Sequence, residues 1–263
     1  MSHTAARSSL RVERDDHVAH LILTGPGKGN AMGPHTWTDI PAALDELEAD
    51  ASIHALVISG HGEHFSYGLD LAAAAAGLEA GDAHARRFFL DEVERMQRAF
   101  TRVAESRLPA IAAVTGWCIG SGVELVAACD MRYAHAGAKF SLREVQLAIV
   151  ADLGGLQRLP YIVGDGHARE LALTGKTVDA RRAAEIGLVN DVVDDVVAHA
   201  LTVAREIAAF SSLTTGGVKR VMNASRGKPI DEGLAYVAAW NAAFLQSADL
   251  TAALSRFKRT QSP

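Results

Sequence analysis

The residues of this chain best suited to chemistry are three carboxylates that lie beside glycines in apolar sequence. Glu124 lies in CIGSGVELVAACD, and Glu144 and Asp152 lie in REVQLAIVADLGGLQRLP. Burial of a charge is costly, and it shifts the pKa of a carboxyl group toward the range that is useful for proton transfer. The three acids therefore predict general acid-base chemistry.

A glycine turn precedes the first of these acids. The segment 110–130 reads as a strand, then the turn Gly120-Ser121-Gly122, then the apolar helix VELVAAC. Free N–H groups at a helix start attract an anion, and a single well-aimed N–H accelerates a reaction through an oxyanion by roughly two to three orders of magnitude. Glycines are also common at such turns without any function. Ser121 does not fit the nucleophile pattern G-x-S-x-G, because Ile119 stands at its first glycine.

Each acid also has a purely structural explanation. Glu124 falls in the first turn of the predicted helix, where the helix dipole alone favours an acid. Asp152 precedes a predicted helix, and aspartate is a preferred N-cap. Arg143 is a potential ion-pair partner of Glu144. The apolar neighbours of Glu124 predict a buried helix, which favours the acid-base interpretation.

Composition excludes several classes of protein. The chain has 263 residues, 49% of them hydrophobic, and a formal net charge of -5. These values predict a large globular core and no basic face for nucleic acid. Cys118 and Cys129 lie in apolar runs, so neither a disulfide framework nor a four-thiolate metal site is expected. The start of the chain lacks the apolar stretch of a signal peptide, and no uncharged run is long enough to span a membrane, so we expect a cytoplasmic protein.

Short β-rich runs alternate with longer segments of helical periodicity. Strands are predicted at 18–23, 54–59 and 111–115, and helices at 36–49 and 83–104. This alternation predicts an α/β architecture with a buried parallel sheet. Beyond about residue 160 the strand signals fade, and we expect a helical appendage with helices at 166–174, 179–186, 196–210 and 230–245. The alanine-rich stretch 71–82 fits either a helix or a loop.

Two further polar motifs carry less information. GPGKGN, at 25–30, lacks the spacing of a phosphate-binding loop, and no G-x-G-x-x-G follows the first strand. His61, Glu63 and His64 lie in a short polar loop, which is more typical of a solvated turn than of a metal site. We therefore expect neither a nucleotide cofactor nor a metal.

Three segments in fixed order carry a family resemblance. HFSYGLDL, AAVTGWCIGSGVELVAACDMRYA and KFSLREVQLAIVADLGGLQRLPYIVG resemble the successive signatures of the crotonase, or enoyl-CoA hydratase/isomerase, family. The resemblance extends over nearly the whole chain. It implies an α/β fold of the crotonase type, with a spiral of β-β-α units and an acyl-CoA site over residues 1–200. A helical region at 201–263, used in trimerisation, is implied to follow.

The resemblance also implies a substrate and an oxyanion hole. Members of the family act on acyl-CoA thioesters, so coenzyme A enters as part of the substrate and no separate cofactor is expected. Two backbone N–H groups hold the thioester oxygen in that family, and the matching positions here are Leu69 and Ser121. Serine replaces the usual glycine at 121, which keeps the N–H donor and adds a side chain to the pocket. A homotrimer, or a hexamer built as a dimer of trimers, is implied as well.

Further contacts with coenzyme A follow from the same resemblance. The implied binding residues within the chain are Lys28, Asn30, Ala31, Met32, Ser66, Tyr67, Gly68 and Gly120. Phe257 and Lys258 are expected to reach the nucleotide of a neighbouring subunit. The stretch 71–90, which ends near Phe88 and Phe89, is expected to shape the acyl-tail pocket, although such phenylalanines are also typical of a helix core.

The three acids divide the implied chemistry between two reactions. Glu124 and Glu144 match the two glutamates with which hydratases activate water for addition to a 2-enoyl-CoA. Asp152 stands where hydratases carry glycine and where dienoyl-CoA isomerases carry an aspartate that shuttles protons with the acid matching Glu144. The isomerases have aspartate at the position of Glu124, so this third acid is one methylene longer.

Other segments favour the isomerases. ACDMRYA, the run from REV to QRLP and YVAAWNAAFLQSAD look closer to dienoyl-CoA isomerases than to hydratases. We therefore expect isomerisation of 3,5-dienoyl-CoA to 2,4-dienoyl-CoA in fatty-acid metabolism. A hydratase that carries Asp152 and a non-catalytic acyl-CoA or RNA binder are the alternatives, and the negative net charge argues against RNA.

Overall fold

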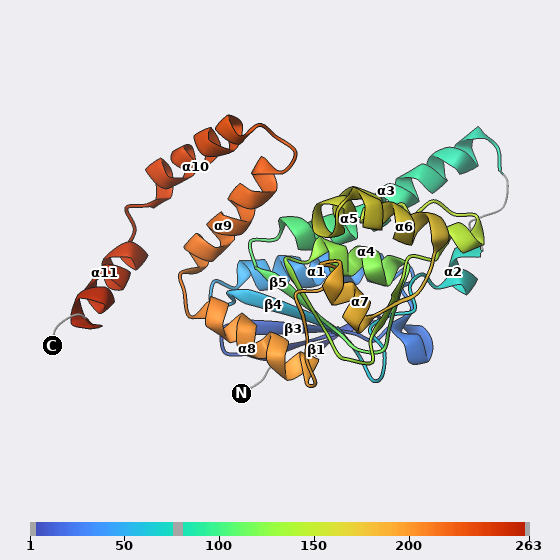
Figure 1. Ribbon diagram of the computed structural model, residues 1–263, viewed down its shortest axis with the longest axis horizontal. Coiled ribbons are helices and arrows are strands. Elements are labelled where there is room, and N and C mark those ends of the chain that lie inside the picture. Colours follow the sequence, from blue (N-terminus) through green and yellow to red (C-terminus); the bar gives the residue numbers. More distant parts are fainter. Residues whose placement is uncertain (1–3, 76–80, 261–263) are drawn as a thin grey trace.

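The computed structural model describes residues 4–75 and 81–260 of the chain (Figure 1). Within these residues the main sheet has seven strands in the order β1-β2-β3-β4-β5-β7-β10. Their bounds are β1 Thr4–Ala6, β2 Leu10–Asp15, β3 Val18–Leu23, β4 Ala55–Gly60, β5 Ala110–Val114, β7 Met131–Ala134 and β10 Asp191–Val192. The strands from β3 to β10 are parallel, which confirms the predicted parallel sheet, and β1 and β2 extend it in antiparallel fashion.

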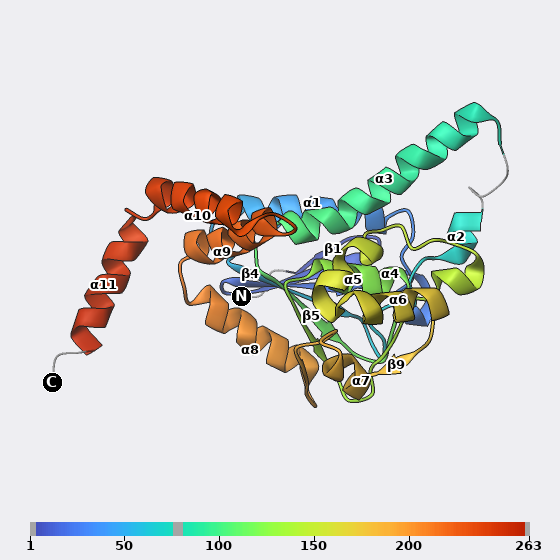
Figure 2. The ribbon, with the colours of Figure 1, turned by 45° about the horizontal axis from the view of Figure 1, so that its top comes forward.

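The central strands are apolar because both faces of the sheet are covered. Every residue of β3 and of β5 is buried, as is usual for parallel strands between layers of helices. Helices α1 (Thr36–Ala49) and α3 (Ala83–Glu105) pack together on one side of the sheet, and α8 (Val196–Ala208) packs on the other (Figure 2). The α1 and α3 bounds agree with the predicted helices.

A second, smaller sheet carries the turn Gly120-Ser121-Gly122 at the end of one of its strands. It contains β6 (Trp117–Ile119), β8 (Lys139–Ser141) and β9 (Val178–Asp179). The parallel register of β6 and β8 pairs Ile119 with Ser141. Because both strands end at the same edge, the turn after β6 and the segment after β8 lie side by side.

The remaining helices before α8 are shorter, and α4 and α7 contact the small sheet. These shorter helices are η1 Pro26–Asn30, α2 Leu71–Ala75, α4 Ser121–Ala128, η2 Glu144–Leu147, α5 Gly155–Val163, α6 Asp165–Thr174 and α7 Ala180–Glu185. Helix α4 lies in contact with both α3 and α5. The alanine-rich stretch 71–82 begins as helix α2, and its residues 76–80 lie outside the described part of the chain.

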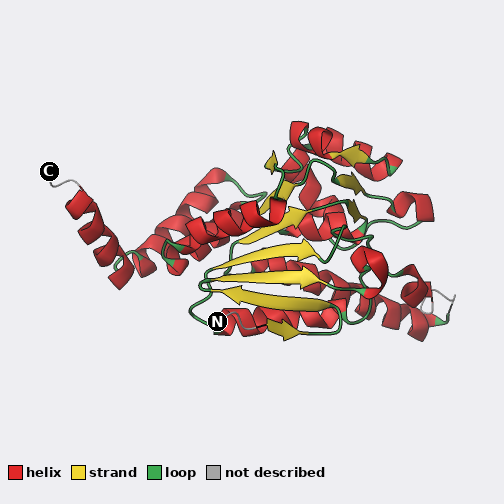
Figure 3. Cartoon of the chain, turned by 90° about the horizontal axis from the view of Figure 1, so that it is seen from below, coloured by secondary structure: helices red, strands yellow, loops and turns green. Residues whose placement is uncertain are grey.

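The C-terminal helical appendage is shorter than predicted. Helices α5 to α8 pack on the core, and only α9 (Ser212–Ser225), α10 (Ile230–Phe244) and α11 (Ala248–Thr260) extend away from it (Figure 3). The expectation that strands end near residue 160 is also wrong, because β9 and β10 follow. Each of those strands has two residues, too few to show a periodic pattern. The division at 200/201 falls inside α8 and stays a prediction.

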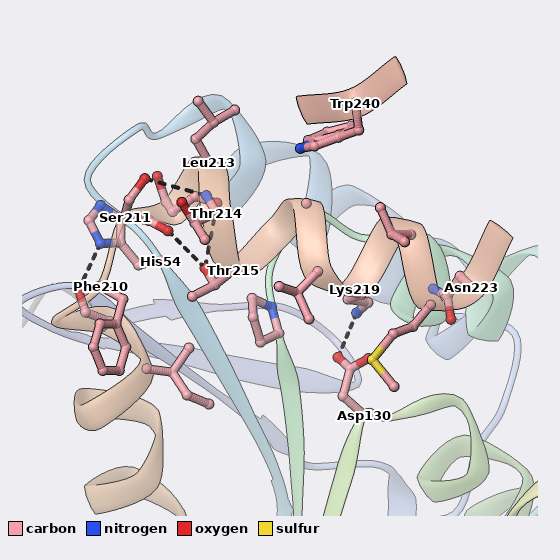
Figure 4. A pocket seen from close by; sticks show the side chains of 18 of the residues that line it. His54, Asp130, Phe210, Ser211, Leu213, Thr214, Thr215, Lys219, Asn223 and Trp240 are labelled. Atoms are coloured by element: carbon pink, nitrogen blue, oxygen red, sulfur yellow. Dashed lines mark hydrogen bonds and ion pairs between the residues drawn. The ribbon is translucent and has the colours of Figure 1, made fainter. Parts of the chain in front are cut away.

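Helix α9 is tied to the core by a buried lysine. Lys219 is 6% exposed, and its Nζ donates to the carbonyl oxygens of Val103 and Leu108 at 3.0 Å each. Its Nζ also lies 2.8 Å from Oδ2 of Asp130 (Figure 4). This contact lines a cavity of about 1390 Å³ between the core and α9 to α11.

The helices of the described residues can be compared with the length and hydropathy of a membrane span. Within the described residues, no single helix is both long and apolar enough to cross a membrane. Helices α8 and α9 satisfy that requirement only in combination, and they are bent by 106° relative to each other.

Candidate active site

The backbone of Gly68, which precedes Leu69, approaches the backbone at the start of helix α4. A Cβ added at Gly68 would lie 2.6 Å from the oxygen of Ile119 and 3.4 Å from the nitrogen of Ser121, so glycine is needed for this close approach. Gly68 has a φ of 87°, and the turn residue Gly120 has a φ of 54°. Among the hydrogen bonds of the described residues, none is donated by the N–H of Leu69 or of Ser121. The predicted pair is thus brought together with both donors available, as an oxyanion hole requires.

The side chain of Ser121 offers no nucleophile. Its hydroxyl oxygen is buried and has no hydrogen-bond partner within the described residues. A serine needs an adjacent base to become nucleophilic. Ser121 is therefore suited to act through its backbone N–H.

Glu144 lies directly against the oxyanion turn. A Cβ at Gly120 would lie 2.8 Å from Oε1 of Glu144, so the carboxyl group approaches the turn at a point where only glycine fits. The other oxygen, Oε2, is buried and has no partner among the described residues. Burial raises the pKa of Glu144, and the nearby charge of Asp152 raises it further. Such a carboxyl group is suited to exchange a proton with a ligand.

Asp152 is not a helix cap. The N-cap of α5 is Gly154, in a left-handed conformation with φ 99°, and the first N–H of this helix, that of Gly155, is donated to Glu124. The Asp152 carboxyl group is half-buried, and burial raises its pKa. The structural explanation from the sequence is therefore wrong, and the side chain is left for another role.

Glu124 is the most deeply buried of the three acids. It is 1% exposed, and its Oε1 accepts hydrogen bonds from the N–H of Leu153 at 2.9 Å and from that of Gly155 at 3.0 Å. Burial raises its pKa to about 7, and the charges of Glu144 and Asp152 contribute in the same direction. The three carboxyl groups therefore lie close enough together for the charges of Glu144 and Asp152 to affect the pKa of Glu124.

Two arginines lie near these acids, and neither pairs with Glu144. Arg143 donates to Oγ of Ser141 at 3.1 Å and lies 5.0 Å from the centre of the Trp117 ring, so the expected ion pair with Glu144 is not formed. Arg158 donates from Nη1 to the carbonyl oxygen of Leu153 at 3.1 Å. Sequence reasoning missed Arg158 because its partner is a backbone oxygen.

The segments predicted to bind coenzyme A lie side by side. Met32 donates its N–H to the oxygen of Gly68 at 2.8 Å, and Tyr67 donates to the oxygen of Gly29 at 2.7 Å. The hydroxyl of Ser66 donates to the oxygen of Asn30 at 2.9 Å. The side chains of Met32, Ser66 and Asn30 are buried, so a ligand would meet chiefly backbone at these three positions.

The outer positions of the predicted coenzyme A site differ in exposure. Ala31 is half-buried, and Tyr67 is exposed and stacked on His64 with the ring centres 5.0 Å apart. The side chains of Lys28 and Lys258 lie outside the described part of the chain. Phe257 lies on α11, far from α4 in both views, so it does not join the site of its own chain (Figures 1 and 2).

The phenylalanines of the predicted acyl-tail stretch and one histidine of the polar loop lie outside the group of three acids. Phe88 and Phe89 are exposed on the first half of α3 and are not helix core. His64 accepts a hydrogen bond from the N–H of Trp117 through Nδ1 at 3.3 Å. Over residues 4–75 and 81–260, no cluster of three or more His, Cys, Asp or Glu is arranged to hold a metal ion.

Known proteins resemble this chain in sequence and in fold. A family model described as enoyl-CoA hydratase/isomerase matches residues 13–263. A peroxisomal Δ(3,5)-Δ(2,4)-dienoyl-CoA isomerase of Arabidopsis thaliana is 39% identical over 254 residues, which cover 94% of this chain and 91% of the relative. A mitochondrial enzyme of the same name from Homo sapiens is 39% identical over 251 residues, covering 92% and 76%. A solved enoyl-CoA hydratase structure from Geobacillus kaustophilus has a TM-score of 0.90 at 25% identity and covers 100% of this chain and 98% of its own.

The chain belongs to the enoyl-CoA hydratase/isomerase family. The predicted family and the crotonase type of α/β fold are thereby confirmed.

The names of the relatives correct one expectation. The dienoyl-CoA isomerases similar to this chain are named as peroxisomal or mitochondrial proteins, so the predicted cytoplasmic location is wrong. That prediction rested on the lack of an apolar signal-peptide stretch. Peroxisomal and mitochondrial targeting segments do not contain such a stretch, so its lack does not exclude those compartments.

Proposed function

We propose that this protein isomerises 3,5-dienoyl-CoA to 2,4-dienoyl-CoA in fatty-acid metabolism. The observation that carries the proposal is the placement of Asp152. This half-buried acid does not cap helix α5, and its charge raises the pKa of Glu144. Two neighbouring carboxyl groups with raised pKa values favour a state in which one holds a proton and the other does not. A 1,5-proton shift needs such a pair.

The reaction starts at the thioester carbonyl. The N–H groups of Leu69 and Ser121 hold the carbonyl oxygen and stabilise the negative charge that develops on it. Glu144 lies against Gly120, next to this oxygen, and removes a proton from C2. The electron pair of the broken C–H bond forms a conjugated enolate through C6.

The second proton transfer completes the shift. Asp152, in its protonated form, delivers a proton to C6, and the C2–C3 and C4–C5 double bonds form as the carbonyl is restored. The substrate and product have the same composition, because one proton leaves C2 and one arrives at C6. The proton on Glu144 must then pass to Asp152, directly or by exchange with solvent, to restore both carboxyl groups for the next turnover. Since the reaction needs only proton transfer, we propose no cofactor beyond the coenzyme A of the substrate.

Glu124 distinguishes the isomerase from the hydratase alternative. A hydratase would use Glu124 and Glu144 together to hold the attacking water. One Glu124 oxygen already accepts two backbone N–H groups, which leaves it less able to orient water. We therefore assign Glu124 a supporting role in the site.

A paired spectrophotometric assay tests the proposal. Purified protein is offered 3,5-dienoyl-CoA and 2-enoyl-CoA, and we expect faster turnover of the diene. Asp152→Asn should abolish diene isomerisation, whereas Asp165→Asn, an exposed acid paired with Arg169, should leave it unchanged. Retained activity of Asp152→Asn would overturn the assignment, and faster loss of the 2-enoyl chromophore would favour the hydratase. A non-catalytic acyl-CoA binder would turn over neither substrate.

We also propose that the chain assembles as a homotrimer or as a dimer of trimers through α9 to α11. Large apolar side chains are exposed on α9 and α10, among them Val218, Met222, Ile230 and Leu234. In such an assembly Phe257 and Lys258 would contact the nucleotide of a neighbouring subunit. Light scattering after size-exclusion chromatography measures the mass, and a monomer at micromolar concentration would refute the proposal.

A further inference from the structure

The turn 152–155 is held by side chains from three helices. Glu124 of α4 accepts the N–H groups of Leu153 and Gly155. Arg158 of α5 donates to the carbonyl oxygen of Leu153. Gln97 of α3 donates from Nε2 to the carbonyl oxygen of Asp152 at 2.8 Å. Only the last of these contacts is made with the residue that carries the proposed proton-donating carboxyl group.

Helix α3 is held in place by core packing close to Gln97. Ala99, Phe100 and Val103 are buried in the core just beyond Gln97, so this part of the helix is fixed by packing. Thr101, one turn after Gln97 on the same face of α3, accepts a hydrogen bond from Nη2 of Arg158 at 3.2 Å. One face of α3 therefore reaches the turn twice, directly through Gln97 and indirectly through Arg158.

We propose that Gln97 is a positioning residue for Asp152, which it fixes by bonding the backbone carbonyl of that residue to α3. This inference rests on the proposed function of Asp152. The orientation of the carbonyl sets the direction from which the Asp152 side chain leaves the backbone. Proton transfer depends steeply on the placement of the donor, so a loosened turn lowers the rate of the chemical step.

The test compares two variants of Gln97 with a control. Gln97→Ala removes the side chain, and Gln97→Glu keeps its shape but replaces the N–H donor with an acceptor. Arg98→Ala is the matched control, since Arg98 lies next in the same helix, is exposed and contacts Glu94 instead of the turn. Circular dichroism and thermal unfolding check that all three variants are folded.

Two readouts separate positioning from a general loss of structure. We expect kcat for 3,5-dienoyl-CoA to fall roughly tenfold or more in both Gln97 variants, with KM changed by less than about twofold. We also expect faster hydrogen-deuterium exchange in the peptide that contains residues 152–155, measured by mass spectrometry without substrate. The Arg98→Ala control should match the parent protein in both.

The outcomes decide the inference and the proposed function separately. Unchanged exchange in both Gln97 variants would overturn the inference, and so would faster exchange with kcat unchanged. Retention of full kcat by Gln97→Glu would also overturn it, because this variant has no donor for the carbonyl. If the parent protein fails to isomerise the diene, the proposed function is wrong. The hydrogen-deuterium exchange of residues 152–155 in the Gln97 variants still shows whether Gln97 holds the turn.

Discussion

Replacing Gly155 with alanine tests how this site accommodates the longer acid at position 124. The φ of Gly155 is not in the left-handed region, so alanine is allowed by the backbone and only space is at issue. The added Cβ would lie 2.8 Å from Cγ of Glu124 and 3.0 Å from its Oε1. Carbon atoms in contact normally lie about 3.5–4.0 Å apart, so the two groups must separate.

Glu124 has little freedom to move away. Its Oε1 is held by the N–H groups of Leu153 and Gly155, and Cγ lies near the backbone end of the side chain. Overpacking of this kind costs about 1–3 kcal/mol in the free energy of unfolding. The displaced carboxylate also releases the turn that carries Asp152, so we expect kcat to fall about tenfold.

Glu124→Asp should abolish or reverse the destabilisation caused by Gly155→Ala. The shorter side chain withdraws its carboxylate, which weakens the two N–H contacts by about 1–3 kcal/mol in total and leaves space beside residue 155. In that background the alanine methyl fills the space, and alanine is favoured over glycine in a helix by up to about 1 kcal/mol. Gly155→Ala should therefore destabilise the parent protein and be neutral or stabilising in Glu124→Asp.

The assay is a double-mutant cycle. Urea unfolding and steady-state kinetics of the parent, the two single variants and the double variant give the coupling between positions 124 and 155, which we expect to be about 1–3 kcal/mol. Gly166→Ala in α6 is the control, since its added Cβ meets nothing within 4 Å. An equal effect of Gly155→Ala in both backgrounds would refute the reasoning.

Three further predictions concern separate parts of the molecule. Ser121→Pro removes the proposed oxyanion donor at the first position of α4, where proline is tolerated, so kcat should fall about 100- to 1000-fold with the fold retained, whereas Ser121→Ala should keep the activity. Burial raises the pKa of Glu124 in the folded protein from 4.5 to about 7, so between these pH values the folded state holds a proton that the unfolded state has lost. The free energy of unfolding therefore falls as the pH rises from about 4.5 to about 7. Glu124→Gln should therefore lose less stability between pH 5 and pH 8 in urea unfolding, by at most about 3 kcal/mol. Lys219→Met removes the donor of two carbonyl oxygens and leaves Asp130 with only the N–H of Ala110 among the described residues, so it should lower the free energy of unfolding by about 3 kcal/mol. An unchanged urea midpoint would contradict this.

Much of the fold was predictable because its signals are local. Strand β3 and helices α1 and α3 follow from the spacing of apolar residues within a few turns of chain. Strands β9 and β10 have two residues each and exist only through pairing with distant strands, so no local pattern predicts them. The packing of α8 on the sheet likewise depends on contacts that its own sequence does not specify.

The candidate site shows the same division at the level of single residues. The acids Glu124, Glu144 and Asp152 are recognisable because carboxylates are rare in apolar, glycine-rich sequence. Gln97 was not recognisable, because its partner is a backbone oxygen 55 residues away. The capping role of Asp152 was expected from the local sequence, and in the structure the N-cap is Gly154 instead, because the chain turns in a left-handed conformation there.

The sequence by itself determined the kind of chemistry: acids for proton transfer, a glycine turn for an anion, and a family in which the two act together. Only the tertiary structure decided how the acids divide that work. It brings Glu124 to the turn 29 to 31 residues further along the chain and uses its carboxylate to bind that turn, while one oxygen of Glu144 has no partner among the residues that the structure describes. Residue type sets what a group can do, whereas packing sets which of its atoms are already engaged.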